Sequence, residues 1–307
     1  MNIVVIFAPL IILSQFISYL SLEKNYSKHT VKAYENDIIE FSHFCEVQYG
    51  IADIDKLDYS LIRLWIVNLS EREINNRSIN RKISSLKSYF KFLQKIGVLD
   101  LNPLVNHKAL KTSKKIEIPF SELEMQNVLS IIEYANDYEG VRDELLIHVL
   151  YATGMRRAEL LELRLSDVDF ETMTIKVLGK RNKERFIPML SETKSKFKSY
   201  FVKRLGLNEI KEVNYVFLTK SGNKMYETLV YRLINKYFRV VSSKVKTSPH
   251  ILRHTFATHL LNKGADLNAV KELLGHSSLA STQVYTHNSI SELKKVHSKA
   301  HPRGNKL

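Results

Sequence analysis

The sequence predicts a mainly α-helical chain of two domains, with a single β-hairpin in the second domain. Apolar residues recur at helical spacing from about residue 13 to residue 106. Alternating β-branched residues, typical of strands, occur in one place, between residues 172 and 189. A basic stretch with few apolar residues, 107–117, interrupts the helical patterns. We therefore expect an N-terminal domain of residues 1–106, a linker of residues 107–117 and a second domain of residues 118–307.

The chain begins with an apolar run, Ile3 to Leu13, that contains Pro9. This run is too short to span a bilayer and lacks the basic start of a signal peptide. We therefore expect no membrane segment and no export, and we place the first helix near Leu13. Residues 1–12 are then either an extension outside the fold or a segment that packs on the N-terminal domain.

Residues 27–49 carry the first clear amphipathic pattern, with apolar side chains every three or four positions. Ser27 is a suitable helix cap. Lys28 and Thr30 add a cation and a hydroxyl donor at the helix N-terminus, where a phosphate group binds favourably. This end of the helix is therefore a candidate DNA contact.

Residues 78–95 repeat the amphipathic pattern, and Arg81 and Lys87 lie largely outside the apolar stripe. A charged outer face is usually only solvated. The pattern alone therefore does not decide between solvation and contact with DNA.

The second domain opens with two predicted helices. Residues 121–132 begin with the S-x-x-E pattern of a capping box, and residues 140–152 are typical of a buried helix that Gly154 ends. Arg156 begins a third helix, on which Glu159 lies one turn further on. A carboxylate beside a guanidinium can orient it for bidentate binding of phosphate. The alternative is an ordinary exposed ion pair, which contributes little.

The β-hairpin is predicted from two strands, residues 172–178 and 184–189. The loop between them is cationic and includes Lys180 and Lys183. Cations in such a loop are most often only solvated turn residues. The loop becomes a candidate site only in combination with other residues.

The segment that begins at Ser248 has the pattern of an anion-binding helix. Ser248 is a good cap and Pro249 a good first helical residue, so His250 and Arg253 share one face of the first turn. Free N–H groups and the helix dipole favour an anion such as phosphate at that position.

A second helix, from about Asp266 to Gly275, ends directly before His276, and Tyr285 follows nine residues later. Each residue alone is a weak signal. A histidine after a helix-ending glycine is more often a capping donor, and a tyrosine is more often packing. Their combination with the preceding helix is what indicates an active site.

These motifs together resemble the C-terminal signature of the tyrosine recombinase (phage integrase) family, and within it the Xer recombinases of bacterial chromosome-dimer resolution. Thr153 to Leu160 matches the first arginine motif of that family, and the cationic hairpin loop resembles its β-hairpin, with Lys183 as the competitor for the lysine position. The resemblance implies six catalytic residues. They are Arg156, Lys180, His250, Arg253, His276 and Tyr285.

The resemblance also implies the architecture: an N-terminal helical core-binding domain of SAM-like fold and an α-rich catalytic domain with a small β-sheet, which together form a C-shaped clamp on DNA. The resemblance also favours contact with DNA over simple solvation for four side chains of the N-terminal domain. They are Lys28, Thr30, Arg81 and Lys87.

Phosphodiester exchange by these residues needs no metal or cofactor, and the sequence contains no carboxylate cluster or P-loop pattern. Two side chains, Arg156 and Arg253, would hold the non-bridging oxygens. Tyr285 would attack the phosphorus to form a 3′-phosphotyrosyl intermediate. The remaining roles are general base for His250, phosphate orientation or proton sharing for His276, and protonation of the departing 5′ oxygen for Lys180.

The composition indicates the kind of binding partner and the cellular compartment. The chain has 46 Lys and Arg against 32 Asp and Glu, a net charge of +14, which favours a polyanion such as double-stranded DNA. A single cysteine, Cys45, permits no internal disulfide and no cysteine metal cluster, which fits the reducing cytoplasm. The resemblance adds a tetramer of identical or paralogous subunits and an FtsK-type translocase as partners.

The tail, residues 286–307, is predicted to form a short helix. Ser289 and Glu292 match a capping box, and a helix of this length must dock on something to be stable. It docks either on its own domain or, as the resemblance implies, on a neighbouring subunit of the tetramer.

Three alternatives to a chromosome-dimer resolvase remain at this stage: a mobile-element integrase or invertase, a type IB topoisomerase, and a catalytically idle DNA-binding relative. The presence of all six residues argues against the idle relative, and the N-terminal helical domain and the tail favour a recombinase over a topoisomerase.

Overall fold

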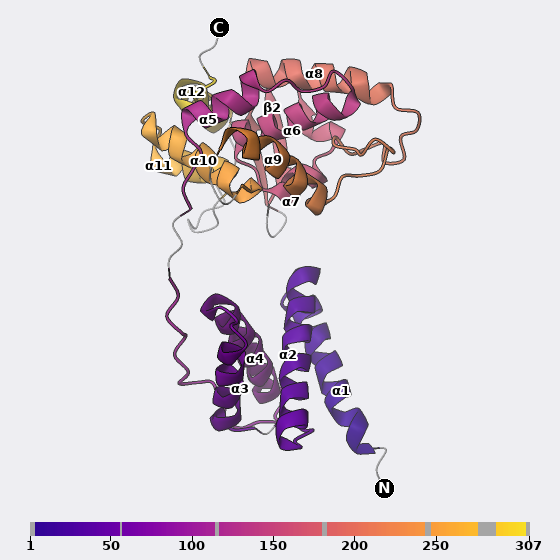
Figure 1. Cartoon of the computed structure of the whole chain (residues 1–307), viewed down its shortest axis with the longest axis vertical. Helices are drawn as coiled ribbons and strands as arrows, with labels where there is room; N and C mark the ends of the chain where they lie inside the picture. The colour runs from indigo at the N-terminus through magenta and orange to yellow at the C-terminus, as the bar shows by residue number, and fades with distance from the viewer. Residues whose placement is uncertain are drawn as a thin grey trace. The chain divides into compact units, whose positions relative to one another are not determined.

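The computed structural model describes residues 4–55, 57–113, 117–179, 183–242, 247–275 and 287–304. The chain divides into two compact units, Met1–Lys115 and Ile116–Leu307 (Figure 1). Both units are mainly helical, and one three-stranded sheet lies in the second. Among the described residues, no helix combines the length and the apolar character that a membrane crossing requires.

The first unit is built from helices. In chain order they are α1 (Val4–Ser18), the π-helical turn η1 (Tyr19–Glu23), α2 (Lys28–Tyr49), α3 (Tyr59–Glu71) and α4 (Asn76–Lys95). The side chains of Ser27, Asp58 and Asn75 cap α2, α3 and α4 by accepting hydrogen bonds from backbone N–H groups of the first turn. Fully buried Trp65 and Phe41 pack in the core with ring centroids 5.0 Å apart. The two helices predicted in this part of the chain are confirmed.

The first helix begins at Val4, so the prediction that it begins near Leu13 is wrong. The two alternatives for residues 1–12, an extension or a segment that packs on the first unit, stay predictions. The helix is anchored by fully buried Phe16, whose ring contacts two aromatic residues of α4. Fully buried Leu20 lies one turn further on. Because these anchors fix the C-terminal end, the apolar run before them continues the same helix.

The first residues of the predicted linker are attached to the first unit. The side-chain amide of Asn80 donates to the carbonyl oxygen of Leu110 at 2.9 Å, and the N–H of Leu110 donates back to Asn80 at 2.8 Å. Asn76 likewise donates to the carbonyl oxygen of Lys111 at 2.7 Å. Leu110 and Lys111 are therefore bound to the side of α4, and the chain up to residue 111 is not a flexible linker.

The second unit has a buried central helix, α6 (Tyr138–Thr153), which packs against α8 (Ser191–Leu205) and α10 (Pro249–Asn262) (Figure 1). The other elements are α5 (Glu122–Gln126), η2 (Asn127–Ile131), α7 (Arg157–Glu162), η3 (Leu165–Asp167), β1 (Val168–Asp169), β2 (Thr174–Leu178), β3 (Glu184–Pro188), α8 (Ser191–Leu205), α9 (Glu227–Val241), α10 (Pro249–Asn262), α11 (Leu267–Leu274) and α12 (His287–Ala300). The capping box predicted at Ser121 is present, with Glu124 as its partner.

The sheet has the antiparallel order β1-β2-β3. Its central register places Val177 opposite Arg185 and Ile175 opposite Ile187, and the N–H of Gly179 donates to the carbonyl oxygen of Lys183 at 2.8 Å at the end of the hairpin. The predicted hairpin is confirmed. Strand β1 was not predicted, because two residues are too few to show an alternating pattern.

The tail helix α12 packs on its own unit. Its side chains Leu293 and Ala300 are buried, and the ring N–H of His297 donates to the carbonyl oxygen of Ala152 at 2.8 Å. Arg303, just beyond the helix, forms ion pairs with Glu192 of α8. The helix includes residue 289, so the capping box predicted there is wrong: the helix starts before it.

Candidate active site

Three of the six predicted catalytic residues lie in the described part of the chain: Arg156, His250 and Arg253. The other three, Lys180, His276 and Tyr285, lie outside the described residues. The described part of the site therefore consists of the first three residues and their neighbours.

The N-terminus of α10 has the predicted form. The hydroxyl oxygen of Ser248 accepts from the N–H of Ile251 at 3.4 Å, and Pro249 is the first helical residue. The side chain of His250 is exposed, and Arg253 is half-buried one turn further on. A helix N-terminus with free N–H groups thus presents a histidine and an arginine together.

The guanidinium of Arg253 is held by two backbone carbonyl groups. Its Nη1 donates to Gly154 at 2.7 Å and its Nη2 to Leu274 at 2.6 Å. These carbonyls belong to the C-terminal ends of α6 and α11, and both ends are capped by a glycine in the left-handed conformation, Gly154 at φ +60° and Gly275 at φ +64°. The carbonyl ends of two helices, which carry partial negative charge, therefore fix the orientation of one cation.

The charge of Arg253 is destabilised by its surroundings. Burial, together with the positive charges of Arg156 and Arg185, lowers the pKa of Arg253 to about 10, and the carboxylate of Glu159 opposes this shift. At neutral pH the guanidinium remains protonated. Several cations close together in a partly buried place are typical of a site that binds an anion.

Arg156 caps the N-terminus of α7 and contacts Glu159 twice. Its Nη1 donates to Oε1 of Glu159 at 2.7 Å, and its backbone N–H donates to Oε2 at 2.7 Å. The predicted pairing of these residues is confirmed. The alternative of an ordinary exposed ion pair is wrong, because Glu159 is only 8% exposed.

Arg185, which was not among the predicted site residues, completes this network. Its Nη1 and Nη2 donate to the two carboxylate oxygens of Glu159 at 3.0 and 2.8 Å, and its Nε donates to the carbonyl oxygen of Leu273 at 3.0 Å. Burial alone would raise the pKa of Glu159, but the hydrogen bonds and charges of Arg185 and Arg156 hold it below its ordinary value. A signal was present: strand alternation puts Arg185 on the same inward face as Ile187, where a charged residue needs a buried partner.

The four candidate DNA contacts of the first unit differ in their environment. Lys28 and Lys87 are exposed, and the hydroxyl of Thr30 lies 2.9 Å from that of Ser27 at the start of α2. Arg81 forms a two-fold ion pair with buried Asp37. Arg81 therefore has a role in holding α4 against α2, although 46% of its side chain is exposed.

Residues 120–292 match the phage integrase family, and residues 13–97 match the N-terminal SAM-like domain of phage integrases. The chain belongs to the phage integrase family. It is a site-specific tyrosine recombinase, an enzyme that breaks and rejoins DNA strands, and the predicted family and enzyme class are confirmed.

Similar proteins include the tyrosine recombinase XerC of Oceanobacillus iheyensis, which is 39% identical over 293 residues, with 94% of this chain and 95% of that protein covered. XerC of Anoxybacillus flavithermus is 38% identical over 294 residues, with 95% and 97% covered. The recombinase is thus similar to XerC proteins along nearly its whole length.

Two solved structures show the same fold. The XerH recombinase bound to palindromic difH substrate has a TM-score of 0.69 at 22% identity, covering 93% of this chain and 84% of that chain. The Tn1549 transposon integrase in complex with circular intermediate DNA has a TM-score of 0.68 at 24% identity, covering 91% and 98%. The predicted fold class, mainly helical with a SAM-like domain and a catalytic domain with a small sheet, is confirmed.

Proposed function

We propose that this recombinase cuts and rejoins double-stranded DNA at a specific site through a 3′-phosphotyrosyl intermediate, and that its role in the cell is the resolution of chromosome dimers. The observation that carries the proposal is the pair Arg156 and Arg253. Each guanidinium is fixed by the protein, at the N-terminal ends of α7 and α10, and the charge of one perturbs the pKa of the other.

The two arginines bind the non-bridging oxygens of the scissile phosphate in this mechanism. Preorganised donors of this kind stabilise charge that develops in a transition state, and each contributes about 3 kcal/mol by analogy with oxyanion-hole donors. His250, exposed at the start of α10, acts as general base for the attacking hydroxyl. A helix N-terminus beside it adds further stabilisation of negative charge.

The three catalytic positions outside the described residues complete the reaction. Tyr285 attacks the phosphorus, and its O–P bond forms as the bond to the 5′ oxygen breaks. Lys180 donates a proton to that oxygen, and His276 orients the phosphate or shares the proton. The phosphotyrosyl bond conserves the energy of the diester, so a second strand can be joined without ATP or another cofactor.

The first unit acts as the core-binding domain in this proposal. Lys28, Thr30, Arg81 and Lys87 are its candidate contacts to phosphate groups, and the net charge of +14 supports a polyanionic partner. As the resemblance to Xer recombinases implies, the proposal includes a tetramer of identical or paralogous subunits, an FtsK-type translocase as a further partner, and a cytoplasmic site of action on the chromosome.

A nicked suicide DNA substrate tests the chemistry. We expect a covalent protein–DNA adduct that Tyr285→Phe cannot form and that Tyr231→Phe, a change at an exposed tyrosine of α9, leaves intact. The adduct should also form in EDTA, since the cations come from side chains. An adduct that maps to Tyr231, or that disappears in EDTA, would contradict the proposal.

The cellular role needs a separate test. Strand exchange between two sites in a native gel distinguishes a recombinase from a topoisomerase-like enzyme or an idle relative. Footprinting the bound site and locating it in the genome distinguishes a chromosomal resolvase from a mobile-element integrase or invertase. A site confined to mobile-element ends would overturn dimer resolution.

A further inference from the structure

Arg185 is a buried cation that none of the six catalytic positions includes. It lies on β3 opposite Val177, and its side chain is 4% exposed. A guanidinium is kept in such a place only with partners for its charge and its N–H groups. The partners of Arg185 are a carboxylate that also contacts Arg156 and the end of α11, which also contacts Arg253.

The first connection is through the carboxylate of Glu159, which accepts four hydrogen bonds. Each oxygen accepts one from Arg185 and one from Arg156. Arg185 uses the two Nη atoms of its fork, whereas the Arg156 side chain contributes only Nη1. In the described part of the chain, Nε and Nη2 of Arg156 have no hydrogen-bond partner, and 28% of that side chain is exposed.

The second connection is to the end of α11. Nε of Arg185 donates to the carbonyl oxygen of Leu273, and the next carbonyl, that of Leu274, accepts from Arg253. Gly275 lies directly against the same side chain: a Cβ added there would be 3.0 Å from Cδ and 3.2 Å from Nη1 of Arg185. Arg185 therefore packs against the end of α11. This end provides the carbonyl oxygen that holds Arg253, and it directly precedes His276 in the chain.

We propose that Arg185 is a positioning residue of the recombinase active site, which neutralises Glu159 so that the charge of Arg156 remains available to the scissile phosphate, and which supports the end of α11 beneath Arg253. The proposal rests on the proposed function. It assigns Arg185 an electrostatic effect on catalysis, although Arg185 itself does not touch the substrate.

The net charge around the anion site depends on Arg185. Three guanidinium groups and one carboxylate leave two positive charges around the anion site. The pentacoordinate transition state of a phosphodiester carries two negative charges. Without Arg185 the carboxylate of Glu159 has only Arg156 as a partner, and one positive charge remains, that of Arg253. Loss of Arg185 therefore raises the free energy of the transition state more than it weakens the binding of DNA.

A methylphosphonate at the scissile position provides the selective readout. It replaces one charged non-bridging oxygen by a methyl group, so its transition state has one negative charge fewer and depends less on Arg156. We expect Arg185→Met to slow adduct formation about a hundredfold on the normal suicide substrate, the scale of one lost preorganised donor, and less than tenfold on the methylphosphonate. Single-site DNA binding in a gel shift should change little.

Two further variants separate charge from folding. Arg185→Lys keeps the charge but loses the two-armed fork, so an intermediate rate is expected. The double variant Arg185→Met with Glu159→Gln removes the carboxylate that would otherwise neutralise Arg156, so it should cleave the normal substrate faster than Arg185→Met alone. Thermal unfolding of each variant tests whether it is folded at the assay temperature.

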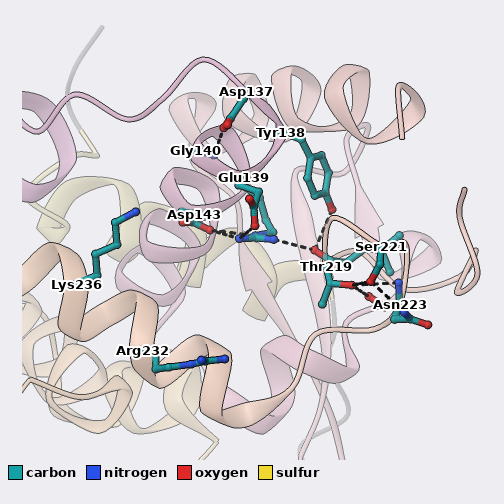
Figure 2. A network of polar contacts seen from close by, with 12 residues as sticks. Asp137, Tyr138, Glu139, Gly140, Asp143, Thr219, Ser221, Asn223, Arg232 and Lys236 are labelled. Atoms are coloured by element: carbon teal, nitrogen blue, oxygen red, sulfur yellow. Dashed lines mark hydrogen bonds and ion pairs between the residues drawn. The ribbon is translucent and has the colours of Figure 1, made fainter. Parts of the chain in front are cut away.

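The same unit offers a matched control in Arg142, which is 1% exposed on α6. Its Nε and Nη2 donate to Asp143 at 3.0 and 2.7 Å, and it also contacts the carbonyl oxygen of Leu218. Figure 2 shows Asp143 and Tyr138 of α6 in this network, beside the turn that contains Thr219. None of these partners belongs to the Arg156 and Arg253 network, so Arg142→Met should cost stability without a preference for the methylphosphonate.

The outcomes are distinct. A larger defect of Arg185→Met on the normal substrate than on the methylphosphonate, absent in Arg142→Met, supports the positioning role. Equal defects on both substrates, or no recovery in the double variant, would assign Arg185 to folding alone and overturn it. If the unchanged protein forms no adduct on either substrate, the proposed function itself fails.

Discussion

Arg253 donates a hydrogen bond of 2.7 Å to the carbonyl oxygen of Gly154, so a side chain of α10 is held by the residue that ends α6. Gly154 has φ +60°, and a Cβ added to it would lie 2.3 Å from Cδ1 of Phe256 and 2.9 Å from Cδ2 of Leu274. Both the backbone conformation and the space require glycine here. The position of a proposed catalytic cation thus depends on a residue that lacks a side chain.

We therefore expect Gly154→Ala to lower both the stability and the cleavage rate. The left-handed conformation alone costs an alanine roughly 1–2 kcal/mol, and displacement of Phe256 adds to this. Gly264→Ala is the matched control, because Gly264 is also left-handed, at φ +81°, but has nothing within 4 Å of an added Cβ. Urea unfolding and adduct formation measure the two effects. Equal losses in the two variants would show that Phe256 and the Arg253 contact do not matter.

A second prediction concerns Lys180, the proposed general acid. Lys180→Ala should cripple cleavage of a normal phosphodiester but be rescued by a 5′-bridging phosphorothiolate, because the sulfur leaves without a proton. Lys183→Ala, a change at the exposed lysine at the end of the same loop, should cleave both substrates at similar rates. The rates are measured by adduct formation on paired suicide substrates. A similar defect of Lys180→Ala on both would limit Lys180 to binding.

Helix ends in the second unit were predictable because their signals are local. The cap at Ser248, the capping box at Ser121 and the left-handed stops at Gly154 and Gly275 each depend on residues within one turn. The pairing of Arg156 with Glu159 was predictable for the same reason.

Other features depend on contacts between distant parts of the chain, which no local pattern encodes. Arg185 reaches Glu159 across 26 positions and Leu273 across 88. The two-residue strand β1 exists because Val168 pairs with Ile175, and α1 extends to Val4 because its other end is anchored on α4. The chemistry of the site could be proposed from local motifs, whereas the contacts that support it become visible only in the fold.

A third prediction concerns pH. The rings of His148 and His297 are fully buried, and burial lowers their pKa values to about 3 and about 4, from about 6.5 in an unfolded chain. Burial also holds the pKa of His301 well below its ordinary value. Charged groups near His148 act in both directions: Glu192 favours protonation, and Lys196 with Arg303 opposes it.

The unfolded chain binds protons at these histidines more readily than the folded chain. Their contribution to stability is therefore complete above about pH 6.5 and is lost as the pH falls from there toward 4, by up to about 1.4 kcal/mol per pH unit for each histidine. Urea unfolding between pH 7 and 5 measures the slope. His297→Gln, which can still donate to Ala152 but does not titrate, should reduce the slope. An unchanged slope in His297→Gln would contradict the argument.

A fourth prediction concerns the tail helix α12, which packs on its own unit in this single chain. Exchange with a neighbouring subunit, which the resemblance implies, stays a prediction. The contacts are specific: Leu293 is 4% exposed, Lys294 donates to the carbonyl oxygen of Thr172 at 2.6 Å, and His297 packs on Phe256 with ring centroids 6.0 Å apart. Docking of this kind stabilises a single chain and needs no second copy.

Leu293→Ala should consequently lower the free energy of unfolding by about 2–3 kcal/mol, the usual cost of truncating a buried leucine, even at concentrations where the protein is a monomer. Lys295→Ala, a change at an exposed position on the same helix, should stay within about 0.5 kcal/mol of the parent.

Removal of residues 289–307 should lower the stability more than either substitution. It should also weaken cooperative pairing on DNA if the helix exchanges once subunits meet. Urea unfolding over a range of protein concentrations separates the two modes, because docking within one chain gives a stability independent of concentration and exchange gives one that rises with it. A loss in Leu293→Ala that appears only at high concentration would overturn docking within the chain.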